Sequence, residues 1–152
     1  MRIIVFSDSH GSTSYMRMAL LDHPEADMII HLGDGERDLE NLSEHIGDRR
    51  IVQVCGNCDF CSQLPVNETI DIAGVRIFCS HGHAESVKYG TEGLIKKAKL
   101  LGAHIALYGH THQAVTSYDD GLHIMNPGAV RSGQYGVIDI TPSGIMLLKM
   151  EV

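Results

Sequence analysis

The chain has 152 residues, of which 43% are hydrophobic and 20% charged, and its formal net charge at pH 7 is −7. This length and composition are typical of one globular domain with a substantial core, so we expect a single domain over residues 1–152. The acidic balance argues against an extended nucleic-acid surface, because binding to a phosphate backbone requires clustered lysine and arginine. Any phosphate that the chain binds would need local positive charge, such as bound divalent metal ions.

The apolar N-terminal run turns polar at Ser7, too early for a signal peptide. No apolar run approaches the length that spans a bilayer. We therefore expect a cytoplasmic protein that has no membrane partner.

In chain order, the first half alternates apolar strands with helical segments. We expect a buried strand over 2–6, a helix that opens near Ser12, a strand over 27–32, a helical segment ended by Gly47 and a strand over 51–54. The apolar side of the first helix is predicted to consist of Tyr15, Met18, Ala19 and the following leucines. That of the second segment is predicted to consist of Leu39, Leu42 and Ile46.

The second half favours antiparallel pairing. Residues 68–72 and 75–78 flank Ala73-Gly74 as a hairpin, a helix follows Thr91, and a strand over 104–108 comes next. Four further strands separated by turns complete the chain. An α/β first half followed by an antiparallel second half indicates two packed mixed sheets with helices outside, a four-layer αββα sandwich.

Four cysteines, three of them at Cys55, Cys58 and Cys61, raise the alternatives of a disulfide framework and a structural zinc knuckle. Disulfide scaffolds belong to small secreted chains, and a knuckle needs a second ligand pair, whereas Cys79 stands alone. The simplest interpretation is that Cys55 and Cys79 are small buried apolar residues.

Five of the predicted strands end in polar side chains suited to metal ions. Because ligands gather beyond the carboxyl ends of parallel strands, we expect these side chains to meet at one edge. They are Asp8, His10, Asp34, Asn57, His81, His110 and His112. These seven oxygen and imidazole donors are more than one four-coordinate ion can bind. They suit two divalent ions that are bridged by a carboxylate. Two such ions activate water and clamp the oxygens of an in-line displacement, which is the chemistry of phosphoester hydrolysis.

The order Asp-x-His, Gly-Asp, Gly-Asn-x-Asp, His and Gly-His-x-His over residues 8–112 resembles the calcineurin-like metallophosphoesterase superfamily. The short chain and the sequence Gly-Asn-Cys-Asp at 56–59 resemble its small YfcE-like phosphodiesterase branch. The resemblance implies the αββα fold and attack of metal-bound hydroxide on a small phosphodiester. It also implies two divalent ions per chain, with manganese favoured and iron, nickel and zinc as alternatives.

The resemblance further implies a role for each donor. It places Asp8, His10 and His112 on one ion, places Asn57, His81 and His110 on the other, and makes Asp34 the bridge. Asp34, Asn57, His81 and His110 are the residues that we expect to be catalytic. Asn126-Pro127-Gly128 followed by Arg131 also resembles the branch and gives Arg131 a minor substrate contact.

Position 58 departs from the family pattern, because the larger active members usually carry histidine there. A neutral thiol is a poorer general acid than imidazole at pH 7, so we expect slow turnover or a preference for good leaving groups. We predict that Cys58 lies beside the substrate. His83 is a candidate for substrate contact, with packing within its loop as the alternative. Asp59 is predicted to orient a neighbour, His31 to be buried and hydrogen-bonded, and His104 to be structural.

A non-catalytic interaction scaffold is the alternative function, since the retromer scaffolding subunit resembles the same branch and a fold does not guarantee a chemistry. A scaffold is free to lose ligands, whereas none of the seven donor positions is missing here, which favours catalysis. A zinc-knuckle binding module is a more distant alternative. A homo-oligomer remains open.

Overall fold

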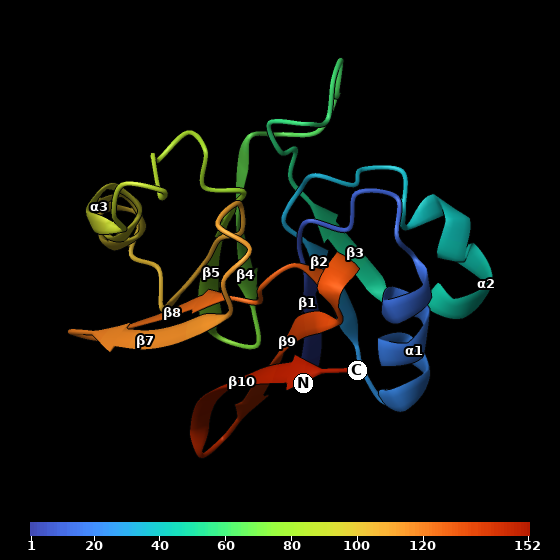
Figure 1. Ribbon diagram of the computed structural model, residues 1–152. Coiled ribbons are helices and arrows are strands. Elements are labelled where there is room, and N and C mark those ends of the chain that lie inside the picture. The colour runs from blue at the N-terminus through green and yellow to red at the C-terminus, as the bar shows by residue number, and fades with distance from the viewer.

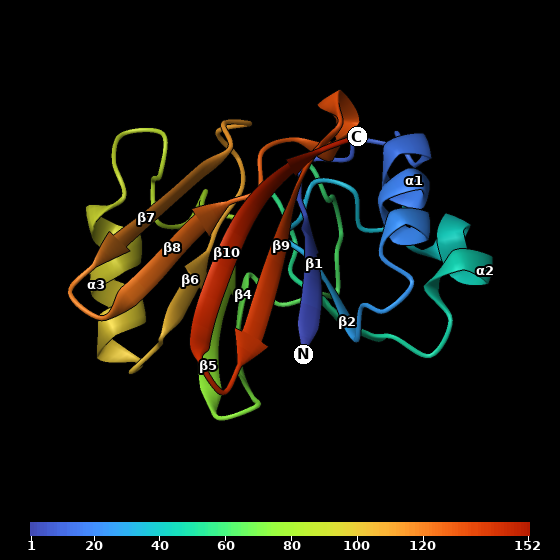
Figure 2. The same ribbon diagram turned by 90° about the horizontal axis from the view of Figure 1, so that it is seen from below.

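Two five-stranded sheets pack face to face, with helices on both outer sides, in the computed structural model, which describes residues 1–152 (Figure 1). Sheet 1 has the strand order β10-β9-β1-β2-β3, and sheet 2 has the order β4-β5-β6-β8-β7. Helices α1 and α2 cover sheet 1 and α3 covers sheet 2 (Figure 2). The predicted αββα sandwich is therefore confirmed.

The bounds of the elements agree closely with the sequence prediction. Sheet 1 contains β1 (Arg2–Phe6), β2 (Met28–His31), β3 (Arg50–Gln53), β9 (Gln134–Thr141) and β10 (Gly144–Glu151). Sheet 2 contains β4 (Asn67–Ile72), β5 (Val75–Ser80), β6 (Ile105–Leu107), β7 (Val115–Asp119) and β8 (Leu122–Asn126). The helices are α1 (Ser14–Asp22), α2 (Ser43–Ile46) and α3 (Glu92–Leu100), with the 3₁₀ turns η1 (Glu40–Leu42) and η2 (Val130–Ser132).

Strand β1 shows how the sandwich forms its core. Ile3 and Val5 point between the sheets, into a cluster that includes Ile77 of sheet 2. Ile4 and Phe6 point the other way, toward the cluster beneath α1. Because successive side chains of a strand alternate between faces, a continuous apolar run is required where both faces are covered.

The strand directions place one set of loops together. Strands β1, β2 and β3 run parallel in sheet 1, and β5, β6 and β8 run parallel in sheet 2. The expected antiparallel pairing of the last third is confirmed for β7 with β8 and for β9 with β10, but β8 also pairs in parallel with β6, which was not expected. The hairpin that adds β7 at the sheet edge returns the chain alongside β6, so β8 lies parallel to β6.

The predicted apolar side of α1 is also wrong in part. Met16, Ala19 and Leu20 are buried, whereas Tyr15 is 36% and Met18 is 45% exposed. The helix begins at Ser14 and has more apolar residues than one face can hold. Sheet 1 therefore selects a single i, i+3, i+4 set.

All four cysteines are free, so no disulfide framework forms. Cys79 is buried as predicted, Cys55 is half-buried, and Cys58 and Cys61 are exposed. None of the helices has both the length and the apolar character needed to cross a bilayer.

Candidate metal centre

Each predicted donor lies in a loop that begins at the carboxyl end of a strand. Asp8 and His10 follow β1, Asp34 follows β2, Asn57 follows β3, His81 follows β5, and His110 and His112 follow β6. Because both sheets direct their parallel strands toward the same edge, these loops meet there (Figure 1). The structure thus brings donors from both sheets together.

One group of donors consists of Asp8, His10 and His112. The Nε2 atom of His112 lies 3.0 Å from Oδ1 of Asp8, and Nε2 of His10 lies 3.7 Å from the same oxygen. All three ligand atoms lie within 4.8 Å of one another, so a single ion could contact them together.

A second group consists of Asp34, His81 and His110, with Asn57 beside it. The Nε2 atom of His81 lies 3.0 Å from Oδ1 of Asn57, 3.2 Å from Nδ1 of His110 and 3.3 Å from Oδ2 of Asp34. The same carboxylate oxygen of Asp34 lies 3.7 Å from Nε2 of His10. Asp34 therefore stands between the two groups, where a bridging ligand would be.

The hydrogen bonding of His81 tests whether these donors suit a cation. Nδ1 of His81 lies 2.8 Å from the carbonyl oxygen of Leu32, so Nδ1 must carry the proton that this acceptor requires. In the neutral ring the lone pair of Nε2 then faces the oxygens of Asn57 and Asp34. Three electron-rich atoms that point at one another require a cation or an added proton.

The electrostatics agree with this geometry. Burial lowers the pKa of His81, but the hydrogen bond to Asp34 and the charges of Asp8 and Asp34 outweigh it and raise the pKa. Burial raises the pKa of Asp34, yet hydrogen bonds from His81 and from the Cys58 amide lower it overall. The donor set favours positive charge and fits divalent metal ions.

Five of the seven donors have left-handed backbone conformations. The φ angles are 56° at Asp8, 47° at His10, 58° at Asp34, 68° at His110 and 57° at His112. A non-glycine residue in this region costs about 1–3 kcal/mol and persists only where the surroundings impose it. The loops are therefore held in an unfavourable shape that directs the donors inward.

Asp59 holds two of these loops together. Its carboxylate accepts hydrogen bonds from the backbone amides of Asp34 at 2.8 Å, Gly35 at 2.9 Å, Glu36 at 3.1 Å and Gly56 at 2.7 Å. Burial alone would raise the pKa of Asp59, but these four donors lower it. The prediction that Asp59 orients a neighbour is confirmed.

A second connection runs through three buried side chains that lie beneath the donors. Nδ1 of His31 accepts from the Gly33 amide at 3.2 Å, so Nε2 carries the proton and donates to Oγ of Ser9 at 2.9 Å. Ser9 donates to Asp38 at 2.5 Å. This chain ties the loop of Asp8 and His10 to the loop of Asp34. Sequence reasoning identified His31 as buried and hydrogen-bonded but did not find Ser9 or Asp38.

His31 makes the stability of the fold dependent on pH. Burial lowers the pKa of His31 to about 4, whereas an unfolded chain has the ordinary value near 6.5. As pH falls below 6.5, His31 binds a proton in the unfolded state but stays neutral in the folded state. The stability present above pH 6.5 is therefore lost as pH falls toward 4.

We expect the metal-free protein to lose about 2 kcal/mol of unfolding free energy between pH 7 and pH 5 through this residue. Glutamine in His31→Gln keeps one hydrogen-bond donor and one acceptor but does not titrate. The variant should therefore lose about 2 kcal/mol less unfolding free energy than the wild type between pH 7 and pH 5. Urea unfolding of both proteins in the presence of chelator measures the difference. Equal pH dependence in the two proteins would contradict the role assigned to His31.

The remaining predicted site residues lie at different distances from the donors. Cys58 belongs to a group with His10 and Asp34 and is exposed. The ring centroid of His83 lies 5.5 Å from that of His81, and its buried Nδ1 has no hydrogen-bond partner. Arg131 is an exposed residue of η2 and is not a member of the donor groups. Substrate contact by these three residues stays a prediction.

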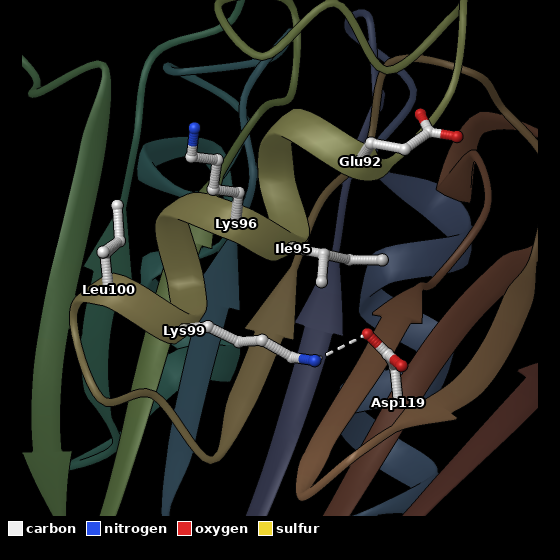
Figure 3. Close-up of a pocket in the computed structure, with 6 residues that line it drawn as sticks. All are labelled: Glu92, Ile95, Lys96, Lys99, Leu100 and Asp119. Atoms are coloured by element: carbon white, nitrogen blue, oxygen red, sulfur yellow. Dashed lines mark hydrogen bonds and ion pairs between the residues drawn. The ribbon is translucent and has the colours of Figure 1, made fainter.

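The cavity shown in Figure 3 is not the candidate centre. It has a volume of about 530 Å³, lies between α3 and β7, and contains none of the metal donors. Lys99 reaches across it to Asp119 at 2.8 Å, and Lys97 pairs with Glu85 on the neighbouring loop. These two lysines are therefore engaged in ion pairs.

A two-sheet sandwich that gathers aspartate, asparagine and histidine donors at its strand ends defines a metallophosphoesterase-type protein. The chain belongs to the calcineurin-like phosphoesterase superfamily, whose domain model matches residues 1–143. Probable metallophosphoesterase YsnB of Bacillus subtilis is 30% identical over 132 residues, which cover 86% of this chain and 76% of YsnB. Phosphodiesterase YfcE of Escherichia coli is 25% identical over 168 residues, covering 91% and 88%.

The fold is also that of Vps29. Wild-type Vps29 of Entamoeba histolytica, solved as a complex with Zn²⁺, matches with a TM-score of 0.79 and covers 99% of both chains. Its sequence identity is 19%, so this likeness concerns the fold alone.

Proposed function

We propose that the protein hydrolyses phosphodiesters with two divalent metal ions held at the candidate metal centre. The observation that carries the proposal is the position of Asp34, whose Oδ2 lies 3.7 Å from His10 Nε2 and 3.3 Å from His81 Nε2. Asp8, His10 and His112 would hold one ion, and Asn57, His81 and His110 the other, with Asp34 shared. The relative YfcE is named a phosphodiesterase, which supports a diester rather than a monoester as the substrate.

The ions, when bound, neutralise charge on the phosphoryl oxygens and lower the pKa of a water toward neutrality. The chain supplies the geometry for this chemistry. Asp34 fixes the spacing of the two groups. The Leu32 carbonyl holds His81 in the tautomer whose Nε2 lone pair is directed at the centre.

The complete donor set favours catalysis over a scaffold function. Keeping five donors in left-handed backbone costs stability, and a protein used only as a binding surface has no need of that cost. Manganese is the metal that we propose, with iron, nickel and zinc as alternatives, and the mixture of oxygen and imidazole donors suits all of them.

Metal dependence tests the proposal directly. We expect chelation to abolish hydrolysis of an aryl phosphodiester and added manganese to restore it. Activity should rise from acid to mildly alkaline pH, because protons compete with metal for the histidines and the attacking water must lose a proton. Elemental analysis should find two ions per chain. Hydrolysis by protein shown to be metal-free, or saturation at one ion per chain, would refute the two-metal mechanism.

A further inference from the structure

Two cavities adjoin the loops that carry the metal donors, and they differ in charge. One, of about 320 Å³, lies between the loops after β2 and β3 of sheet 1 and includes three acidic residues, Glu36, Asp38 and Asp59, against one basic residue, Arg37. The other, of about 390 Å³, lies between the loops after β5 and β6 of sheet 2 and has no carboxylate. Its lining consists of Val87, Lys88, Tyr108, Thr111, Gln113 and Val115. In a chain of net charge −7, a cavity without acidic groups is suited to an anion.

The cavity of sheet 2 contains hydrogen-bond donors that have no acceptor in the protein. Lys88 is exposed and forms no ion pair, unlike Lys97 and Lys99, which pair with Glu85 and Asp119. Tyr108 is only 5% exposed, and its hydroxyl makes no hydrogen bond. Because His83 Nδ1 is the one fully enclosed side-chain polar atom that lacks a partner, the Tyr108 hydroxyl must be accessible to solvent, and Tyr108 is a lining residue of this cavity.

Thr111 adds a third donor, and a buried residue holds it in place. Its Oγ1 accepts hydrogen bonds from Nδ2 of Asn126 at 2.9 Å and from the amide of Gln113 at 3.4 Å, so its own proton has no acceptor. Asn126 is fully buried and also donates to the carbonyl of Gly109 at 3.0 Å. The hydroxyl of Thr111 is thus fixed before any ligand arrives, which reduces the entropic cost of binding.

The cavity is continuous along the chain with the metal donors. Thr111 stands between His110 and His112, and Tyr108 precedes the same loop. A substrate whose phosphorus lies at the metal centre can therefore extend one substituent into this cavity.

We propose that the cavity lined by Lys88, Tyr108 and Thr111 is a subsite for a second phosphoryl group, carried on one ester substituent of the phosphodiester. The subsite rests on the proposed function. The ammonium of Lys88, the hydroxyls of Tyr108 and Thr111 and the side-chain amide of Gln113 offer several separate donors. They suit the three terminal oxygens of a phosphate better than the two oxygens of a carboxylate.

Three matched substrates test the subsite. Each is a 4-nitrophenyl phosphodiester whose second ester group is a three-carbon chain that ends in a phosphate, a carboxylate or a hydroxyl. We expect kcat/KM to be highest for the phosphate. Lys88→Gln should reduce the preference for phosphate over hydroxyl by about three- to tenfold, the range expected for a partly solvated charged contact. Tyr108→Phe, which removes only the hydroxyl, should reduce it by about two- to fivefold.

Lys96→Gln is the matched control, because Lys96 is an exposed lysine without an ion pair that lines the separate cavity between α3 and β7 (Figure 3). It should leave the preference unchanged. A binding measurement that needs no turnover is calorimetric titration of the metal-loaded protein with propane-1,3-diol bisphosphate and with the monophosphate. The bisphosphate should bind more tightly, and Lys88→Gln should remove the difference.

The outcomes separate the two proposals. Hydrolysis of all three substrates with no preference for the phosphate, or a preference that survives in Lys88→Gln, would overturn the subsite and leave the proposed function intact. Tighter binding of the bisphosphate without hydrolysis of any diester would support the subsite and overturn the proposed function. An equal preference for carboxylate and phosphate would overturn the assignment to a phosphoryl group.

Discussion

Asp34→Asn is expected to lower kcat/KM for an aryl phosphodiester by more than about 100-fold, since loss of groups that only orient a ligand already costs 10- to 100-fold. The substitution removes a negative charge that both donor groups share, so both ions should bind more weakly. Asparagine keeps an oxygen that can accept from the Cys58 amide, which lies 2.8 Å from Asp34 Oδ1. The fold should therefore survive. Elemental analysis and kinetics on the same preparation measure both effects.

His112→Ala and Asp119→Asn serve as comparisons. His112 contacts the group of Asp8 alone, so its loss should weaken one ion and leave the other bound. Asp119 lies on exposed β7 and pairs with Lys99, away from the centre, so its neutralisation should change neither metal content nor activity. Full activity or an unchanged metal content in Asp34→Asn would mean that Asp34 does not bridge two ions.

Cys58→His is expected to raise the hydrolysis of diesters with poor leaving groups by about 10²–10⁴-fold, the usual contribution of a general acid. Cys58 is exposed and its Sγ lies in a group with His10 and Asp34, so there is space for a larger ring beside the centre. Although the residue is exposed, partial desolvation and then the charge of Asp34 raise the pKa of the Cys58 thiol and make it a still weaker acid at neutral pH. Aryl diesters, which release a stable anion, should gain much less. The measurement is kcat/KM for alkyl and aryl diesters.

Two serine variants show whether the thiol itself reacts. Cys58→Ser should change the turnover of aryl diesters little, because the thiol is not the nucleophile in the proposed mechanism. Cys61→Ser is the matched control, since Cys61 is also free and exposed and lies three residues along the same loop. Complete loss of activity in metal-loaded Cys58→Ser, with Cys61→Ser unaffected, would assign the thiol a direct part in the chemistry.

The sandwich was predictable because uninterrupted apolar runs indicate strands that are buried on both faces. Residues 3–6 are apolar without interruption, which indicates a strand covered on both faces, and the structure divides them between two clusters. The faces of α1 were not predictable, because its apolar residues exceed one face and only the position of sheet 1 selects among them. The parallel pairing of β8 with β6 was not predictable either. A hairpin such as β7–β8 can be identified in a sequence, but the sequence does not show which other strand will pair with β8.

The donors of the candidate centre were predictable because each follows an apolar run that ends in a polar residue. The residues that hold the donors were harder to find. Asp38 and Ser9 meet across 29 positions of sequence and resemble ordinary loop residues until the fold brings them to 2.5 Å. Thr111 lies within the recognised motif, but the structure was needed to show that Asn126 fixes its hydroxyl.

The left-handed backbone at the donors has a consequence for how such a sequence changes over generations. Backbone strain alone would favour glycine at His10, His110 and His112, because glycine adopts these angles without steric conflict. The carboxylates of Asp8 and Asp34 also accept hydrogen bonds from backbone amides, so glycine there would cost those bonds. Each histidine replacement would relieve a local strain of about 1 kcal/mol or more while removing a donor. A duplicate of the gene under no selection for metal binding would therefore relieve backbone strain as it lost its histidine donors. We therefore expect all seven donors to persist in a copy of this sandwich only where metal binding is under selection.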